Sequence, residues 1–166
     1  GYAIDDAPAQ VWDVTTGTPM PQDLSDALDD DNHLVLAHNS MFDRPIIEHT
    51  LDIKLPMHRW RDSMVKAYTL GLPGSLAQLG QALGLSDDQA KMSDGHKLVM
   101  KFCKPAPTNH KAFKYDKTTH PAEWLRFIEY CGQDVEAMRT IWKLMPDIND
   151  VDHEMDLWHL DQEIND

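Results

Sequence analysis

The longest regular hydrophobic pattern lies in the C-terminal third of the chain. Apolar residues recur there at intervals of three and four, at Trp124, Phe127, Ile128, Cys131, Val135, Met138, Ile141 and Trp142. This spacing predicts an amphipathic helix. Pro121 suits the first residue of such a helix, and Pro146 would stop it. A last, acidic helix is predicted over about residues 151–164.

The N-terminal half predicts strands that are followed by helices. Residues 33–37 form a compact apolar run, which is typical of a buried parallel strand, and a helix is expected from about residue 42 to 51. Further short strands are expected over residues 2–5, 11–15 and 59–62. Further short helices are expected over residues 21–31, from 63 to about 71, over 75–84 and over 97–104. Strands followed by helices place the fold in the α/β class.

Length and composition narrow the class of protein. The chain has 166 residues, of which 42% are hydrophobic and 26% charged, as in an ordinary globular domain. No apolar run approaches the roughly 20 residues that span a membrane, so an integral membrane protein is excluded. The first residues carry no targeting signal, and two cysteines make no disulfide framework. We therefore expect a cytoplasmic protein.

The charge is strongly negative but uneven. The net charge is −13, yet residues 91–117 hold seven Lys against two Asp, a local net of +5. The overall charge argues against indiscriminate binding to duplex DNA, where phosphate contacts dominate the affinity. The basic segment also contains Phe102, Phe113 and Tyr115, and lysines interleaved with aromatic rings are typical of single-strand binding. A solvated loop is the alternative interpretation.

Two short patterns carry residues suited to catalysis. Asn39 and Asp43 follow the apolar strand at the point where a helix begins, which is where open α/β sheets place ligand sites. Tyr130 and Asp134 are four residues apart on the long predicted helix, so both project from one face. The plainer alternatives are that Asp43 caps a helix, that Tyr130 is a core aromatic, and that Asp134 pairs with an arginine.

Together these patterns resemble motifs of the DnaQ-like exonucleases. Asn39, Phe42 and Asp43 match the second motif, and Tyr130 and Asp134 match the third. Position 129 is Glu, where one branch of the family has His, so the chain is similar to the Tyr branch. The flanking sequence resembles the exonuclease domain of family A DNA polymerases from phages and prophages. The resemblance implies an RNase H-like mixed sheet flanked by helices.

This resemblance implies two-metal hydrolysis of a phosphodiester at a DNA 3′ end. The expected cofactors are two Mg²⁺ or Mn²⁺ ions, with Asp43 and Asp134 as ligands and the Tyr130 hydroxyl orienting the attacking water. Asn39 and Phe42 would contact the terminal nucleotides, and Lys97 and Lys101 would bind the strand. The expected partners are a single-stranded DNA 3′ end and a polymerase module of the same parent chain.

The chain departs from the family in one respect. The first motif, Asp-x-Glu on the first central strand, has no match at the expected place. Asp161 and Glu163 have the right spacing, but they lie in the last predicted helix and are expected to be a solvated face. We therefore expect that strand to be missing and the isolated chain to be weak or inactive. Residues 1–150 would form an incomplete exonuclease domain, and 151–166 would lead towards the polymerase module.

Two other functions fit the same residues. One is a related 3′–5′ exoribonuclease, because the Tyr branch of the family also contains RNA-processing enzymes. The other is a catalytically silent exonuclease-like module that only binds nucleic acid or braces a polymerase. A preference for or against a 2′-hydroxyl would separate the first alternative from a DNA exonuclease.

Overall fold

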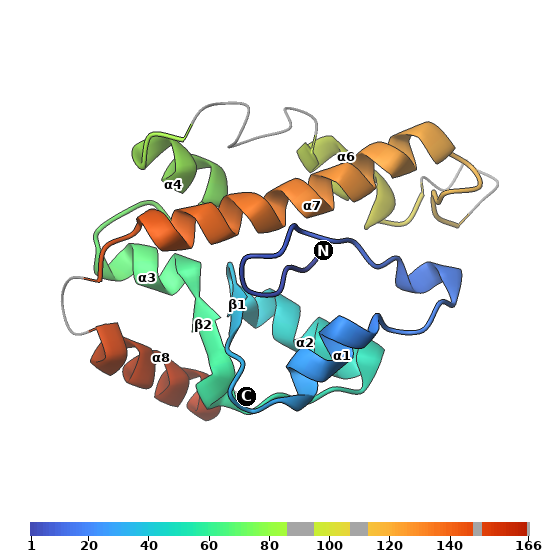
Figure 1. The fold of residues 1–166 in the computed structure, drawn as a ribbon. Helices are drawn as coiled ribbons and strands as arrows, with labels where there is room; N and C mark the ends of the chain where they lie inside the picture. The colour runs from blue at the N-terminus through green and yellow to red at the C-terminus, as the bar shows by residue number, and fades with distance from the viewer. Residues whose placement is uncertain (86–94, 107–112, 148–150, 166) are drawn as a thin grey trace.

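A two-stranded parallel sheet lies at the centre of the molecule, between one long helix and several short ones (Figure 1). The computed structural model describes residues 1–85, 95–106, 113–147 and 151–165. Strand β1 is Val35–Ala37 and strand β2 is Trp60–Asp62, with Val35 opposite Trp60 and Ala37 opposite Asp62. Within the described ranges the two strands pair only with each other. The α/β class is confirmed, and the small parallel sheet is consistent with part of the expected RNase H-like sheet.

A helix follows each strand directly. Helix α2 is Ser40–Leu51, and it begins two residues before the predicted start. Helix α3 is Ser63–Thr69, and the Asp62 side chain caps it by accepting from the Met64 N–H. Because the strands are parallel, their carboxyl ends lie at the same edge of the sheet. The starts of α2 and α3 therefore lie side by side.

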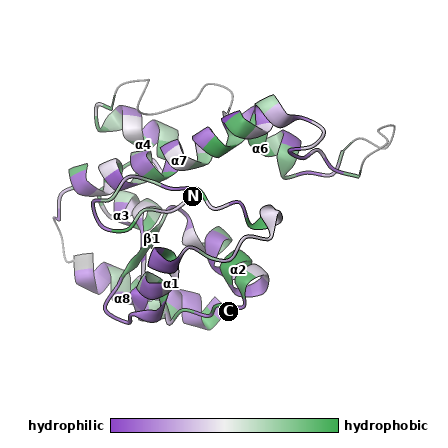
Figure 2. Cartoon of the chain, turned by 45° about the vertical axis from the view of Figure 1, so that its right-hand side comes forward, coloured by the Kyte–Doolittle hydropathy of each residue, from purple (hydrophilic) through white to green (hydrophobic). Residues whose placement is uncertain are grey.

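The long predicted helix is confirmed as α7, Pro121–Leu144, with Pro121 in its first turn. It contacts α3, α4 (Leu76–Ala82) and α6 (Gly95–Phe102). The buried core at its C-terminal end consists of Ala67, Leu79, Ile141 and Met145. Near its N-terminal end, Phe102 packs edge-on to Trp124 and stacks on Phe127, at centroid distances of 5.1 and 5.4 Å. Figure 2 shows hydrophobic residues along the face where α6 meets α7.

The N-terminal segment lies against α7. The Ala9 N–H donates to Glu136 at 2.7 Å, and Arg139 donates to the carbonyl oxygens of Asp5 and Ala7. Tyr2 and Gln10 form an isolated antiparallel bridge, which is what remains of the predicted strand pairing. The strand predicted over residues 11–15 is wrong.

Local hydrogen bonds explain that error. The Asp13 carboxylate accepts from the Thr15 N–H at 2.9 Å, and Gly17 adopts a left-handed conformation with φ 72°. These contacts close the short 3₁₀ helix η1, Val14–Thr16, in place of an extended strand. Side-chain bonds of this kind compete with strand formation in short polar segments.

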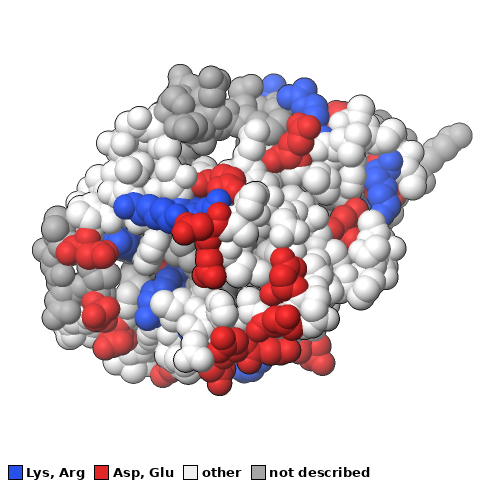
Figure 3. Space-filling view, viewed as in Figure 1, with Lys and Arg blue, Asp and Glu red and all other residues white. Residues whose placement is uncertain are grey.

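Helix α1, Gln22–Asp29, lies near the sheet and is held by one buried arginine. Arg59, at the end of the 3₁₀ helix η2 (Met57–Arg59), is 2% exposed and donates to the carbonyl oxygens of Ala27, Leu28 and His33. The N-terminal part of the chain is poor in basic side chains, since no Lys or Arg occurs before residue 44, and α1 is mainly hydrophilic (Figure 2). Figure 3 shows acidic side chains gathered along the lower edge of the molecule.

Helix α8, Val151–Asn165, packs against α3 and η2. Met155 is buried, the His159 Nε2–H donates to the Trp60 carbonyl oxygen at 2.9 Å, and Arg44 donates to the Gln162 side chain at 2.7 Å. None of the helices in the described ranges has both the length and the apolar character needed to cross a membrane.

Candidate active site

Three of the predicted site residues lie at the start of α2. Asn39 is the N-cap residue, Phe42 is in the first turn with 70% of its surface exposed, and Asp43 follows it. The interpretation of Asp43 as a helix cap is wrong. A cap at Asp43 requires a helix that begins at residue 44, whereas α2 begins at Ser40. The Asn39 side chain makes no capping hydrogen bond. All three residues are exposed at the edge of the sheet where β1 ends, and the carboxylate of Asp43 is partly desolvated there.

Tyr130 and Asp134 lie one turn apart on α7, and both are half-buried. The Tyr130 hydroxyl donates a hydrogen bond to the Asp134 carboxylate. Burial raises the pKa of Tyr130, and the hydrogen bond to Asp134 raises it further. The phenol therefore stays protonated at neutral pH and acts as a hydrogen-bond donor. Arg139, one arginine proposed to pair with Asp134, instead contacts Glu136 and the N-terminal segment.

The ring of Tyr130 is held by a glycine of α6. A Cβ atom placed on Gly95 would lie 2.2 Å from Cε2 and 2.4 Å from Cδ2 of that ring. The ring therefore lies directly on the backbone of α6, and only glycine leaves room for it. This contact fixes the direction in which the hydroxyl points.

The start of α2 and the middle of α7 are linked through Asp62 and His38. Burial raises the pKa of both Asp43 and Asp134. The charge of Asp62 acts on the pKa of Asp43 and on that of His38, and His38 and Asp134 act on each other. A chain of electrostatic interactions therefore connects Asp43 with Asp134 at this edge of the sheet.

The sequence did not single out Asp62, which lies at the centre of this region. It is 2% exposed, and its carboxylate accepts the N–H groups of Asn39 at 3.0 Å and Ser40 at 2.7 Å. Its negative charge also raises the pKa of Asp43, after the larger effect of burial. An Asp at the start of a helix is a recognisable capping signal. Its hydrogen bonds to Asn39 and Ser40, which are 23 and 22 positions away in the chain, cannot be seen in the sequence.

His38 is a second residue of the region that was not predicted. Its Nε2–H donates to the Gly74 carbonyl oxygen at 2.9 Å, and Nδ1 contacts the Ser63 hydroxyl at 2.9 Å. Burial lowers the pKa of His38, while the charges of Asp62 and Asp134 act in the opposite direction. His38 is therefore held neutral beside the two carboxylates.

The donor chemistry of the site suits a divalent cation in part. Asp43 and Asp134 are partly desolvated carboxylates with raised pKa values, and a nearby cation stabilises such groups in their charged form. Carboxylate oxygens are also the ligands that Mg²⁺ and Mn²⁺ prefer. Among the described residues, however, no group of three or more His, Cys, Asp or Glu side chains could hold a metal ion. The residues present therefore form only part of a ligand set.

The predicted strand-binding lysines differ in their surroundings. Lys97 is exposed on α6, two residues after Gly95, so its side chain points to a different side of the helix from the contact with Tyr130. Lys101 forms an ion pair with Glu123 and lies 5.3 Å from the centre of the Tyr115 ring. Glu123 is two turns from Tyr130, about 10 Å along the helix axis. The predicted basic segment falls partly on residues 86–94 and 107–112, which lie outside the described residues.

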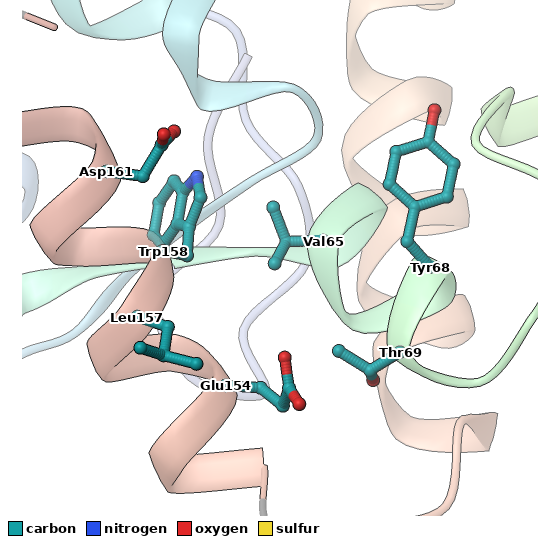
Figure 4. A pocket seen from close by; sticks show the side chains of 7 residues that line it. All are labelled: Val65, Tyr68, Thr69, Glu154, Leu157, Trp158 and Asp161. Atoms are coloured by element: carbon teal, nitrogen blue, oxygen red, sulfur yellow. The ribbon is translucent and has the colours of Figure 1, made fainter.

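A shallow groove of about 390 Å³ lies elsewhere, between α3 and α8 (Figure 4). Its lining includes Tyr68 of α3 and Leu157, Trp158 and Asp161 of α8. None of the predicted site residues lines it. Asp161 accepts hydrogen bonds from Gln162 and Asn165 of its own helix, which agrees with the expectation of a solvated face rather than a metal site.

Comparison with known proteins gave two matches. The family model for the RNase H superfamily matches residues 9–146. The chain is 36% identical, over 168 aligned residues, to the protein named DNA polymerase of Bacillus phage SP02. The match covers 99% of the chain and 26% of the phage protein, so the chain spans about a quarter of that relative's length. No solved structure matches the chain significantly.

Proposed function

The chain belongs to the RNase H superfamily and resembles part of a phage DNA polymerase, so it is a nuclease-type domain associated with a polymerase. We propose that it is a 3′–5′ exonuclease acting on single-stranded DNA. One observation carries this proposal. Asp43 of α2 and the hydrogen-bonded pair Tyr130–Asp134 of α7 are connected through the charges of Asp62 and His38 at the edge of the sheet where both strands end. This edge, outside the carboxyl ends of the strands, is where α/β folds bind ligands.

Asp43 and Asp134 would hold divalent ions, Mg²⁺ or Mn²⁺, with further ligands completing the set. When bound, such ions lower the pKa of the attacking water and stabilise the leaving oxygen. Tyr130 would orient the attacking water through its hydroxyl oxygen, which can accept a hydrogen bond from the water while its proton is donated to Asp134. Its raised pKa keeps the phenol protonated, so it would not act as the base. His38, whose pKa is lowered by burial, would add no positive charge to compete with the ions.

The exposed start of α2 supports a single strand as the substrate. The Phe42 ring is 70% exposed, and an exposed aromatic ring offers a stacking face to any base. Asn39 beside it offers both a donor and an acceptor through its side-chain amide. Exposed Lys97 on α6 would contact the phosphate backbone, whereas Lys101 would first have to leave Glu123.

The setting of this activity would be a DNA polymerase. The phage relative is about four times as long as the match, which leaves room for a polymerase module beside the exonuclease. In that setting residues 1–150 would form the exonuclease domain, and α8 would lead towards the polymerase module. The reaction would remove mispaired nucleotides from the primer end.

The test is degradation of a 3′-labelled single-stranded DNA by the chain and by the complete gene product that contains it. The reactions contain Mg²⁺ or Mn²⁺, and Asp134→Ala is run beside each. Release of labelled mononucleotide by the complete product, lost in Asp134→Ala, supports the proposal. Equal or faster degradation of the matched RNA favours the exoribonuclease. Strand binding without hydrolysis in any form identifies a silent binding module.

A further inference from the structure

The residue at the start of α2 has an unusual backbone. Asn39 adopts φ 63° and ψ 55°, a left-handed conformation that costs free energy for a residue with a Cβ atom. An N-cap residue normally has an extended conformation, and its own side chain accepts from an N–H of the first turn. Asn39 has neither feature, since its side chain makes no capping bond. Another group must therefore hold this turn in place.

That group is the Asp62 carboxylate. Oδ1 accepts from the Asn39 N–H at 3.0 Å and the Met64 N–H at 2.8 Å, and Oδ2 accepts from the Ser40 N–H at 2.7 Å. One buried side chain thus holds the starts of α2 and α3 together across the edge of the sheet. Both oxygens are already engaged and the residue is 2% exposed, so Asp62 is suited to positioning rather than to metal binding.

We propose that Asp62 is a positioning residue that holds Asn39 in its left-handed conformation. In this way Asp62 presents the Asn39 side-chain amide to an unpaired nucleic-acid end. This inference rests on the proposed function. Because Asp62 satisfies the N–H groups, the Asn39 amide is not used as a cap. It lies exposed beside Phe42, where one strand end can contact both side chains. Strained backbone held by its surroundings is typical of binding sites.

The test is a double-mutant cycle on strand affinity. A fluorescent single-stranded DNA is titrated, with EDTA present to prevent hydrolysis, against the wild-type chain, Asp62→Asn, Asn39→Gly and the double variant. Glycine adopts the left-handed conformation without strain, so Asn39→Gly removes the amide and keeps the turn. We expect each single variant to bind about tenfold more weakly, the loss of about one hydrogen bond. The double variant should bind no more weakly than Asn39→Gly.

A general structural role gives a different result. If Asp62→Asn merely loosens the fold, its loss of affinity also appears in the Asn39→Gly background, and the double variant binds about a hundredfold more weakly than wild type. Additive losses therefore overturn this inference and leave the proposed function intact. Failure of the wild-type chain to bind any single strand overturns both.

Two further comparisons complete the test. Asp30→Asn is the matched control, because Asp30 likewise accepts a backbone N–H group, that of Asn32 at 2.9 Å, outside both the proposed site and the basic segment. It should bind DNA like the wild type. If Asp62→Asn does not fold, Asn39→Ala is compared with Asn39→Gly. The two should bind within about twofold of each other because Asp62 holds either backbone, and a fivefold or larger deficit in Asn39→Ala overturns the inference.

Discussion

Gly95→Ala tests the contact that fixes the Tyr130 ring. Gly95 is buried at the start of α6, and its missing side chain leaves room for the ring edge. The added Cβ would lie 2.2 Å from Cε2, 2.4 Å from Cδ2 and 2.9 Å from Cζ. The backbone of Gly95 does not have a positive φ, so the substitution acts through this contact and not through backbone strain.

The size of the effect follows from these distances. Carbon atoms in contact need about 3.5 Å, so the ring must retreat by more than about 1 Å. Overpacking of this kind costs about 1–3 kcal/mol of unfolding free energy. Displacing the hydroxyl by about 1 Å would lower the rate of hydrolysis by about 10²-fold if Tyr130 orients the attacking water. Affinity for a single strand should be unchanged.

The assay measures hydrolysis of a labelled 3′ end by the complete gene product, together with urea denaturation of the chain. Gly132→Ala is the matched control, because its Cβ would meet only the Val11 side chain, at an ordinary 3.6 Å. It should keep full activity and be more stable by up to about 1 kcal/mol, since it replaces glycine inside α7. A Gly95→Ala protein that is destabilised but hydrolyses DNA at the normal rate would refute the role given to Tyr130.

Three further predictions concern buried polar groups. Burial raises the pKa of Asp134, so its charged form destabilises the metal-free protein at neutral pH. Asp134→Asn should therefore raise the midpoint of urea denaturation while it abolishes hydrolysis. A lower midpoint would contradict this. Burial lowers the pKa of His38, so the unfolded state binds more protons as the pH falls through about 6.5. Stability should therefore decline from about pH 7.5 to 5.5, and His38→Gln should decline less steeply; equal slopes would argue against a neutral His38. Arg59→Met leaves buried carbonyl oxygens unpaired, so it should lower the free energy of unfolding by about 3 kcal/mol, measured by urea denaturation. A decrease of less than about 1 kcal/mol would show that water replaces the guanidinium.

The sequence was sufficient where a pattern repeats locally. The apolar spacing and the flanking prolines predicted α7 almost to its ends, at Pro121 and Leu144. The Tyr130–Asp134 pair followed from helical spacing alone, since residues four apart share a face. The apolar run before Asn39 likewise predicted a parallel strand, although only Val35–Ala37 pair in the structure.

The sequence was insufficient where the decisive contact is distant. Asp62 and Asn39 are 23 residues apart, and nothing in either local pattern indicates that one carboxylate holds the other's backbone. The burial of Lys66, 3% exposed and paired with Asp147 and the Trp142 ring, is equally invisible because lysine is normally exposed. The strand prediction for residues 11–15 was wrong for the opposite reason. A local hydrogen bond from the Thr15 N–H to the Asp13 carboxylate outweighed the strand propensity of this segment.

The most direct test of the central claim is editing of a primer end by the complete gene product. A primer–template with a mispaired, labelled 3′ nucleotide is compared with a fully paired one, in Mg²⁺, for the wild type and for Asp134→Asn. Our account predicts that the wild type releases the mispaired nucleotide faster than the paired one and that Asp134→Asn releases neither. Release that persists in Asp134→Asn, or none from the wild type with either ion, would contradict it.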